Sequence, residues 1–181
     1  KLGEPVLRLT RFWRAYGAAS SSGKLNVQNI PGFIGQGPLQ APSVFNFFSP
    51  FYAPPGEILD QGLAAPEMQL ATEYLNSLIT NYFFILSYCY NTAPVQGCPP
   101  VPPEFQQDLV IIDTGPERAL AADPQALVSR IADRLAGGSI SATLRAQAVA
   151  MVEAVPASET SLRVAEAHYL ISTSPELALQ R

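Results

Sequence analysis

The chain has 181 residues, of which 48% are hydrophobic and 14% are charged, and its formal net charge at pH 7 is -4. This apolar content is sufficient for one hydrophobic core and argues against a disordered chain. The acidic balance, without any run of five or more Lys and Arg residues, argues against a nucleic-acid partner, because phosphate binding requires a basic surface.

The amino-terminal region predicts one helix followed by a loop. Pro5 suits the first turn of a helix, and apolar residues recur at three- and four-residue spacing from Val6 until Gly17 ends the pattern. The opposite face is basic and carries Arg8, Arg11 and Arg14. The stretch 18–37 is rich in Ser and Gly, and we predict that it is a loop.

Residues 38–66 combine prolines with aromatic side chains, which is incompatible with a long regular helix or a central strand. The segment is also too apolar for a solvated linker. We therefore predict an irregular segment that packs across the helices, in which proline lowers the entropy of the free chain. The expected anchors are Phe45, Phe47, Phe48, Phe51 and Tyr52.

The clearest predicted helix begins at Pro66 and Glu67 and keeps one apolar face for about six turns, as far as Cys89. The longest apolar stretch, 78–90, contains polar residues and is shorter than the roughly 20 residues that span a bilayer. No transmembrane segment is predicted. The short apolar run 109–112 is compatible with one strand or with a buried turn.

The carboxy-terminal region predicts a series of short helices. The first begins at Asp123 and Pro124 and ends at Gly137. The next three are predicted to begin at Ser141, at Ser158 and at Ser174. Helices with such short connections pack as antiparallel neighbours. The predicted fold is therefore mainly α: an irregular helical bundle with a long proline- and aromatic-rich non-regular segment and little or no β structure.

Charge is unevenly distributed along the chain. Between Lys24 and Arg118 there are eight acidic residues and no Lys or Arg. Three explanations stay open: a basic surface, from the first helix or from an amino-terminal region, packs against this acidic middle; the acids are solvated; or they hold a cation such as calcium, although no dense ligand loop is present.

Two cysteines, Cys89 and Cys98, lie nine positions apart across a loop that contains proline and glycine. In an exported protein this spacing favours a local disulfide, whereas in a cytosolic protein two unrelated thiols are expected. A metal site is not predicted, because further ligands are lacking and the single histidine is distant in sequence. Nor does any glycine pattern predict a cofactor site.

Four polar residues are weak catalytic candidates: Asn46, Glu67, Glu73 and His168. His168, on the penultimate predicted helix, lacks the nucleophile and orienting acid of a catalytic triad, which favours a surface or half-buried position. Glu67 and Glu73 are six residues apart on one predicted helix and therefore do not share a face. The aromatic residues between 45 and 52 are interpreted as core cover, with a sugar- or peptide-binding platform as the alternative.

A series of short segments, taken in order, resembles a known family. These segments are Leu2–Arg8, Ala41–Pro50, Pro54–Gly56, Gly62–Gln69 and Tyr169–Glu176. They are similar to the carboxy-terminal part of the bacterial family called domain of unknown function 1800 (DUF1800). The match spans nearly the whole chain, and the ordered set is specific although each segment alone is weak.

The resemblance implies that residues 1–181 are a single carboxy-terminal portion of a larger helical domain in an exported parent protein. It also implies that the polar, His- and Glu-rich motifs lie in the amino-terminal part. No reaction is established for the family, so no catalytic residue is carried over and enzyme activity stays open. Residues 91–117 depart from the expected pattern and are predicted to be a loop insertion.

We therefore expect a structural or assembly module of an extracytoplasmic bacterial protein, periplasmic or secreted. Its expected partners are the amino-terminal part of the same protein and, as the resemblance implies, an exported protein similar to a sulfatase. One alternative is the wall of a hydrolase-like or metal-dependent enzyme whose main site lies in the amino-terminal part. A carbohydrate-binding platform is the other alternative.

Overall fold

The computed structural model describes residues 1–25 and 31–179 and is mainly α, with isolated bridges but no sheet in this described part. The elements in chain order are α1 (Pro5–Ala15), α2 (Pro31–Ile34), α3 (Glu57–Asp60), η1 (Pro66–Leu70), α4 (Glu73–Tyr88), α5 (Pro103–Gln106), α6 (Gly115–Arg118), α7 (Pro124–Ala136), α8 (Ala142–Glu153), α9 (Thr160–Thr173) and α10 (Pro175–Ala178). The predicted fold class is confirmed. The predicted loop 18–37 partly lies outside the described residues, and its described part contains the unpredicted helix α2.

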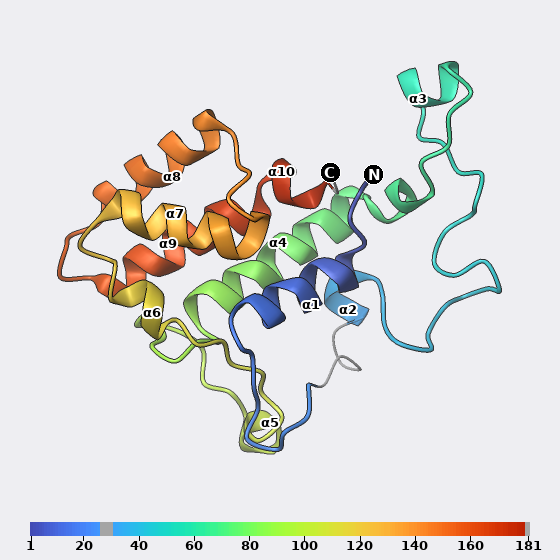
Figure 1. Cartoon of the computed structure of the whole chain (residues 1–181). Coiled ribbons are helices and arrows are strands. Elements are labelled where there is room, and N and C mark those ends of the chain that lie inside the picture. Colours follow the sequence, from blue (N-terminus) through green and yellow to red (C-terminus); the bar gives the residue numbers. More distant parts are fainter. Residues whose placement is uncertain (26–30, 180–181) are drawn as a thin grey trace.

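The helical body is organised around α9, which packs against α4 on one side and against α7 and α8 on the other (Figure 1). The short helices α6 and α10 cover further parts of α9, and α1 packs against α7. Near the two ends of the described chain, the Gly3 backbone N–H donates to the Ala178 carbonyl at 2.7 Å. The first and last elements are thereby joined.

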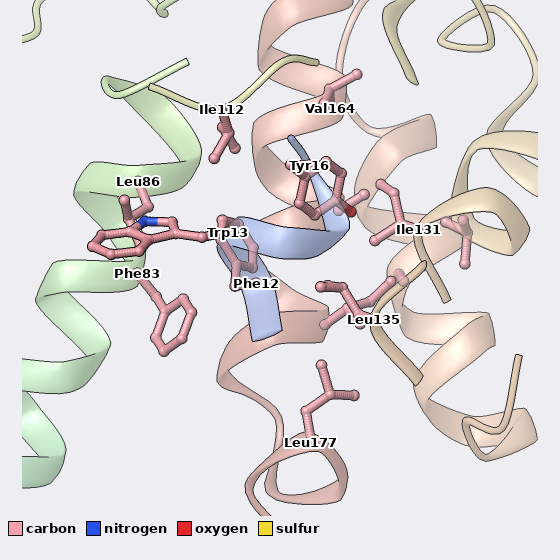
Figure 2. Packing of buried hydrophobic residues seen from close by; sticks show 14 of the residues in the cluster. Phe12, Trp13, Tyr16, Phe83, Leu86, Ile112, Ile131, Leu135, Val164 and Leu177 are labelled. Atoms are coloured by element: carbon pink, nitrogen blue, oxygen red, sulfur yellow. The ribbon is translucent and has the colours of Figure 1, made fainter. Parts of the chain in front are cut away.

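Helix α1 supplies the largest side chains of the core. Its apolar residues recur at helical spacing, so Leu9, Phe12, Trp13 and Tyr16 fall on one face, where each is no more than 2% exposed. Figure 2 shows this face between Phe83 and Leu86 of α4 and Ile131 and Leu135 of α7. Burial of each such side chain contributes roughly 1.5–3 kcal/mol.

The basic face of α1 donates hydrogen bonds to backbone carbonyls of the carboxy-terminal helices. The Arg8 guanidinium donates to the Ser172 carbonyl and the Arg11 guanidinium to the Leu177 carbonyl, each at 3.2 Å. These arginines therefore connect α1 to the end of α9 and to α10. Arg8 also lies over the ring of Phe83 in α4, and Lys1, shortly before α1, pairs with Glu67. Packing of the basic amino-terminal residues against the acidic middle therefore stays one of the open explanations for the uneven charge.

The central helix is shorter than predicted. The chain forms the 3-10 helix η1 from Pro66 and then breaks, so α4 begins only at Glu73. The break has a local cause: Thr72 is extended, and its hydroxyl oxygen accepts a hydrogen bond from the Leu75 backbone N–H at 3.2 Å. Thr72 is therefore the N-cap of a new helix, a signal that the sequence prediction overlooked.

The carboxy-terminal helices agree closely with the predicted boundaries. Three predicted caps are present, because the side chains of Asp123, Ser141 and Ser174 accept backbone hydrogen bonds at the starts of α7, α8 and α10. Helix α9 begins at Thr160, two positions after the predicted start at Ser158, since residues 156–159 form a turn. Left-handed Gly137 ends α7 as expected.

Residues 91–117 contain two short helices, α5 and α6, and are joined to the body by hydrogen bonds. Ile111 exchanges two backbone hydrogen bonds with Ala19, at 2.8 and 2.9 Å, and the Ile112 N–H donates to the Tyr90 carbonyl at 3.0 Å. The run 109–112 is therefore an extended piece with isolated bridges and a buried Ile112. That residues 91–117 are an insertion stays a prediction.

Candidate functional site

The proline- and aromatic-rich residues 38–65, here called the projecting segment, leave the helical body instead of packing across it. Figure 1 shows them extending away from α4, with α3 at the far end. Phe45 is 62% exposed, Phe51 is 87% exposed and Val44 is 95% exposed. The prediction that Phe45 and Phe51 are anchors on the helices is therefore wrong, while Phe47, Phe48 and Tyr52 are half-buried.

Hydrogen bonds hold the base of the projecting segment close to η1. The Ser49 N–H donates to the Gln69 side-chain oxygen, and the Ala65 N–H donates to the Tyr52 carbonyl, both at 2.8 Å. Residues 42–51 and Gln69 surround a surface hollow of about 340 Å³. The segment thus has a local conformation of its own, although Phe45 and Phe51 are largely exposed.

Asn46 lies in this hollow and adopts a left-handed backbone conformation with φ of 71°. Asparagine tolerates this region better than most residues with a side chain. Its N–H donates to the Ser43 carbonyl at 3.2 Å, and the Ser43 hydroxyl oxygen accepts from the Phe45 N–H at 3.1 Å. Asn46 therefore closes a turn and places polar groups beside exposed aromatic rings.

Glu67 and Glu73 lie on different elements, which corrects their predicted placement on one helix. Glu67, in η1, is buried and forms an ion pair with the Lys1 ammonium at 2.7 Å. The hydrogen bond from Lys1 lowers the pKa of the Glu67 carboxyl. Glu73 is exposed in the first turn of α4, where its charge complements the helix dipole.

His168 is fully buried in the core, so the prediction of a surface or half-buried position is wrong. Its ring packs against Tyr16, with centroids 4.4 Å apart, and against Phe12 at 6.1 Å. Neither ring nitrogen has a hydrogen-bond partner among the described residues. Burial, together with the positive charge of Arg134, lowers the pKa of His168 to about 3, and the ring is therefore neutral at pH 7.

A buried ionic cluster next to His168 was not predicted. Glu117 of α6 is 0% exposed, and its Oε1 accepts a hydrogen bond from Arg130 Nε at 3.4 Å and forms an ion pair with Arg134 Nε at 3.0 Å. Arg134 also donates to the Ala15 carbonyl at 2.7 Å and lies over the Tyr16 ring. Burial and the Glu117 charge raise the pKa of the Tyr16 hydroxyl. The cluster connects α1, α6 and α7.

Part of this cluster could have been found from the sequence. Arg130 and Arg134 are four residues apart on a well-signalled helix and therefore share a face. The acid that pairs with these two arginines could not be identified from the sequence, because Glu117 is one of eight acids in the region without Lys or Arg. Of the four candidates, Asn46, Glu67 and Glu73 belong to three separate elements outside the core, and only His168 lies near this cluster.

The sulfur atoms of Cys89 and Cys98 lie 2.10 Å apart, at disulfide distance, with their Cα atoms 5.6 Å apart. This agrees with the pairing expected for an exported protein. The pair joins the end of α4 to the proline-rich loop before α5, and the Val95 N–H adds a hydrogen bond to the Tyr88 carbonyl at 2.8 Å. Residues 91–98 are therefore held against the end of α4.

Among residues 1–25 and 31–179, no group of three or more His, Cys, Asp or Glu side chains is arranged to hold a metal ion. None of the helices in this described part has the length and apolar character needed to span a bilayer.

Comparison with known proteins identifies the family. A family model described as "Protein of unknown function (DUF1800)" matches residues 1–179, essentially the whole chain. No curated protein and no solved structure matches the sequence. The motifs on which the resemblance to this family was based lie at the start of α1, in the projecting segment and η1, and in α9 and α10. The chain therefore belongs to the DUF1800 family.

Proposed function

We propose that this chain is a structural and assembly module of an extracytoplasmic bacterial protein, and that the projecting segment is its contact surface for the amino-terminal part of that protein. The observation that carries the proposal is the exposure of large apolar side chains on a segment that leaves the body. Val44, Phe45 and Phe51 are each more than half exposed.

Transfer of a Phe or Val side chain from water into a contact contributes roughly 1.5–3 kcal/mol, so an exposed cluster is a strong driving force for association. The helices of this chain leave Phe45 and Phe51 in solvent. Proline at positions 42, 50, 54 and 55 reduces the entropy that the segment loses on docking.

Support for an extracytoplasmic location comes from the cysteines. Disulfides persist in oxidising compartments, and Cys89 and Cys98 are placed at bonding distance. The pair is local and closes a short loop, so its formation requires no rearrangement of the helical body. Isolation of the parent protein under conditions that block free thiols, followed by mass measurement of the 89–98 region, tests this location.

Hydroxyl-radical footprinting of the intact parent protein tests the contact surface. Phe84, which is 44% exposed on α4, is the matched control because it has the same side chain outside the projecting segment. We expect Phe45 and Phe51 to be modified several-fold less than Phe84, after each rate is divided by its value in the unfolded protein. Pepsin replaces trypsin here, because no Lys or Arg lies between Lys24 and Arg118.

Equal or greater modification of Phe45 and Phe51 in the purified parent would contradict docking onto its own amino-terminal part. Protection that appears only in material from the native compartment would assign the surface to a separate exported partner, such as the sulfatase-like protein that the family resemblance implies. A Phe45→Ser/Phe51→Ser variant should release that partner, whereas Phe84→Ser should retain it.

A carbohydrate-binding platform is the second candidate, and the surface hollow is the observation that favours it. The hollow combines exposed rings with the polar side chains of Asn46, Ser49 and Gln69, the mixture that sugar recognition uses. Titration with soluble peptidoglycan fragments, followed by NMR, separates the candidates. Shifts confined to residues 42–51 and abolished by Phe51→Ala would support the platform, and the absence of any shift would reject it.

A further inference from the structure

A second cleft, separate from the projecting segment, lies between α2, α4 and the loop that follows the disulfide. Its volume is about 490 Å³, within the range of pockets that bind small molecules. Its walls are formed by aromatic and proline side chains and by one carboxylate. The lining residues are Phe33, Tyr82, Tyr90, Pro99, Pro100, Val101, Pro102, Phe105, Asp108, Leu109 and Val110.

One wall of the cleft is built on the helical body. Tyr82 lies on α4, and the ring of Phe33 from α2 stacks on it with centroids 5.6 Å apart and planes inclined by 29°. Tyr82 is buried, and burial raises the pKa of its hydroxyl, so the ring is neutral over the physiological range. The second tyrosine, Tyr90, follows α4 directly.

The opposite wall belongs to residues 99–110, which are held in place from several directions. Cys98, next to Pro99, is at bonding distance from Cys89 at the end of α4. On the far side, Ile112 is hydrogen-bonded to Tyr90. These connections hold the loop that carries Phe105 and Asp108, so the cleft exists before any ligand arrives.

The electrostatics of the cleft favour a positive ligand. Asp108 is the one charged residue in the described lining, and no Lys or Arg contributes to it. A hydrogen bond from the Ser22 N–H to the Gln107 carbonyl brings the loop that carries Lys24 close to this region, but Lys24 does not line the cleft. A cation would therefore meet a carboxylate and aromatic faces, to which it is attracted through their ring quadrupoles.

We propose that this cleft binds a small organic cation, a protonated or quaternary amine attached to an apolar body. The rings of Phe33, Tyr82, Tyr90 and Phe105 provide the apolar and cation–π contacts, and Asp108 provides the charge. A neutral ligand would provide no positive charge to pair with the Asp108 carboxylate, and an anionic ligand would be repelled by it. The proposal is independent of the docking of the projecting segment, because the two sites share no lining residue.

Three probes of similar shape test the charge preference: 2-phenylethylammonium, 2-phenylethanol and phenylacetate. Their affinities for the intact parent protein are measured by calorimetry. We expect the cation to bind about tenfold more tightly than the alcohol, because it adds a cation–π and a carboxylate contact. Phenylacetate should show no measurable binding. Equal affinities for all three probes would overturn the proposal.

Two matched variants locate the charge. Asp108→Asn should lower the preference for the cation over the alcohol about threefold, because the cation–π contacts remain, and should leave the affinity for the alcohol unchanged. Glu104→Gln, which removes an exposed carboxylate from neighbouring α5 outside the lining, should preserve the preference. A preference that is undiminished in Asp108→Asn, or that falls equally in Glu104→Gln, would contradict a local role of Asp108.

Two further measurements do not depend on correct folding of the Asp108→Asn variant. In the unmodified protein, rising ionic strength should weaken binding of the cation and leave binding of the alcohol unchanged. Substitution of both cysteines, Cys89→Ser/Cys98→Ser, should weaken both ligands by the same factor, because it loosens the wall without changing the charge. A salt-independent preference for the cation would overturn the proposal.

Discussion

Helix α1 and the projecting segment are both rich in aromatic side chains, yet they place them in opposite environments. Phe12 and Trp13 of α1 are each 2% exposed, whereas Phe51 of the projecting segment is 87% exposed. Residues 5–16 follow the helical period, so their large side chains gather on one face that the body covers. Proline prevents any regular period in residues 38–55, and their rings cannot form one face for the helices to cover.

This difference shows that apolar composition alone does not predict burial within the same chain. A regular element presents its apolar side chains together, and a neighbouring helix can cover them all. The projecting segment instead depends on a surface of complementary irregular shape. In our proposal that surface belongs to the amino-terminal part of the parent protein, which explains why the segment leaves the body.

The largest expected effect is the loss of a core ring from α1. In the chain 1–181, Phe12→Ala should lower the free energy of unfolding by about 3–5 kcal/mol, because it leaves a cavity between α1 and α4. The matched change Phe51→Ala should alter it by less than about 0.5 kcal/mol. Urea unfolding of both variants measures the contrast. A large loss for Phe51→Ala would show that the segment is covered within this chain.

The next largest effect concerns the buried ionic cluster of the body. Glu117→Gln removes the charge that compensates Arg130 and Arg134 and should cost about 2–4 kcal/mol, less than a fully buried pair because both arginines keep some contact with water. Glu153→Gln, on the exposed side of α8, is the control and should be nearly neutral. Similar unfolding midpoints for the two variants would mean that the cluster contributes little to stability.

The smallest effect is a dependence of core stability on pH. Because the folded pKa of His168, about 3, lies below its unfolded value of about 6.5, the unfolded state gains the proton first and stability falls with pH below about 6.5. Between about pH 6 and pH 4 this should remove about 2 kcal/mol. His168→Leu should lack this component. Parallel pH curves for the two proteins would contradict the depressed pKa of His168.

Local signals explain why parts of the fold were predictable. The starts of α7, α8 and α10 follow from Asp123, Ser141 and Ser174, since a capping side chain acts on its own helix within three residues. The start of α4 was predicted incorrectly, because Pro66 begins a separate short 3-10 helix and the N-cap at Thr72 was therefore overlooked. The pairing of Cys89 with Cys98 was expected for an exported protein, because only nine positions separate the two cysteines.

The candidate sites required information that no local signal contains. A lone histidine on a helix is compatible with the surface or with the core, and only the packing of α1 against α9 places His168 beside Tyr16. The acid that pairs with Arg134 was similarly undetermined, because only the tertiary structure places Glu117 of α6 next to α7. The cleft beside Tyr82 combines α2, α4 and the loop 99–110, which are distant along the chain.

By itself, the sequence determined the mainly helical class, the starts of α1, α7, α8 and α10, and membership of the DUF1800 family, and it favoured the cysteine pair for an exported protein. Periodicity, caps and short spacings concern residues that are close together in the sequence, and ordered motifs are recognised from the residue types themselves. Only the tertiary structure decided which aromatic side chains are buried, which acid pairs with Arg134, and where Asp108 meets aromatic rings. Burial and charge pairing depend on surfaces brought together from distant parts of the chain, and among the described residues such surfaces leave Phe45 and Phe51 of the projecting segment largely exposed.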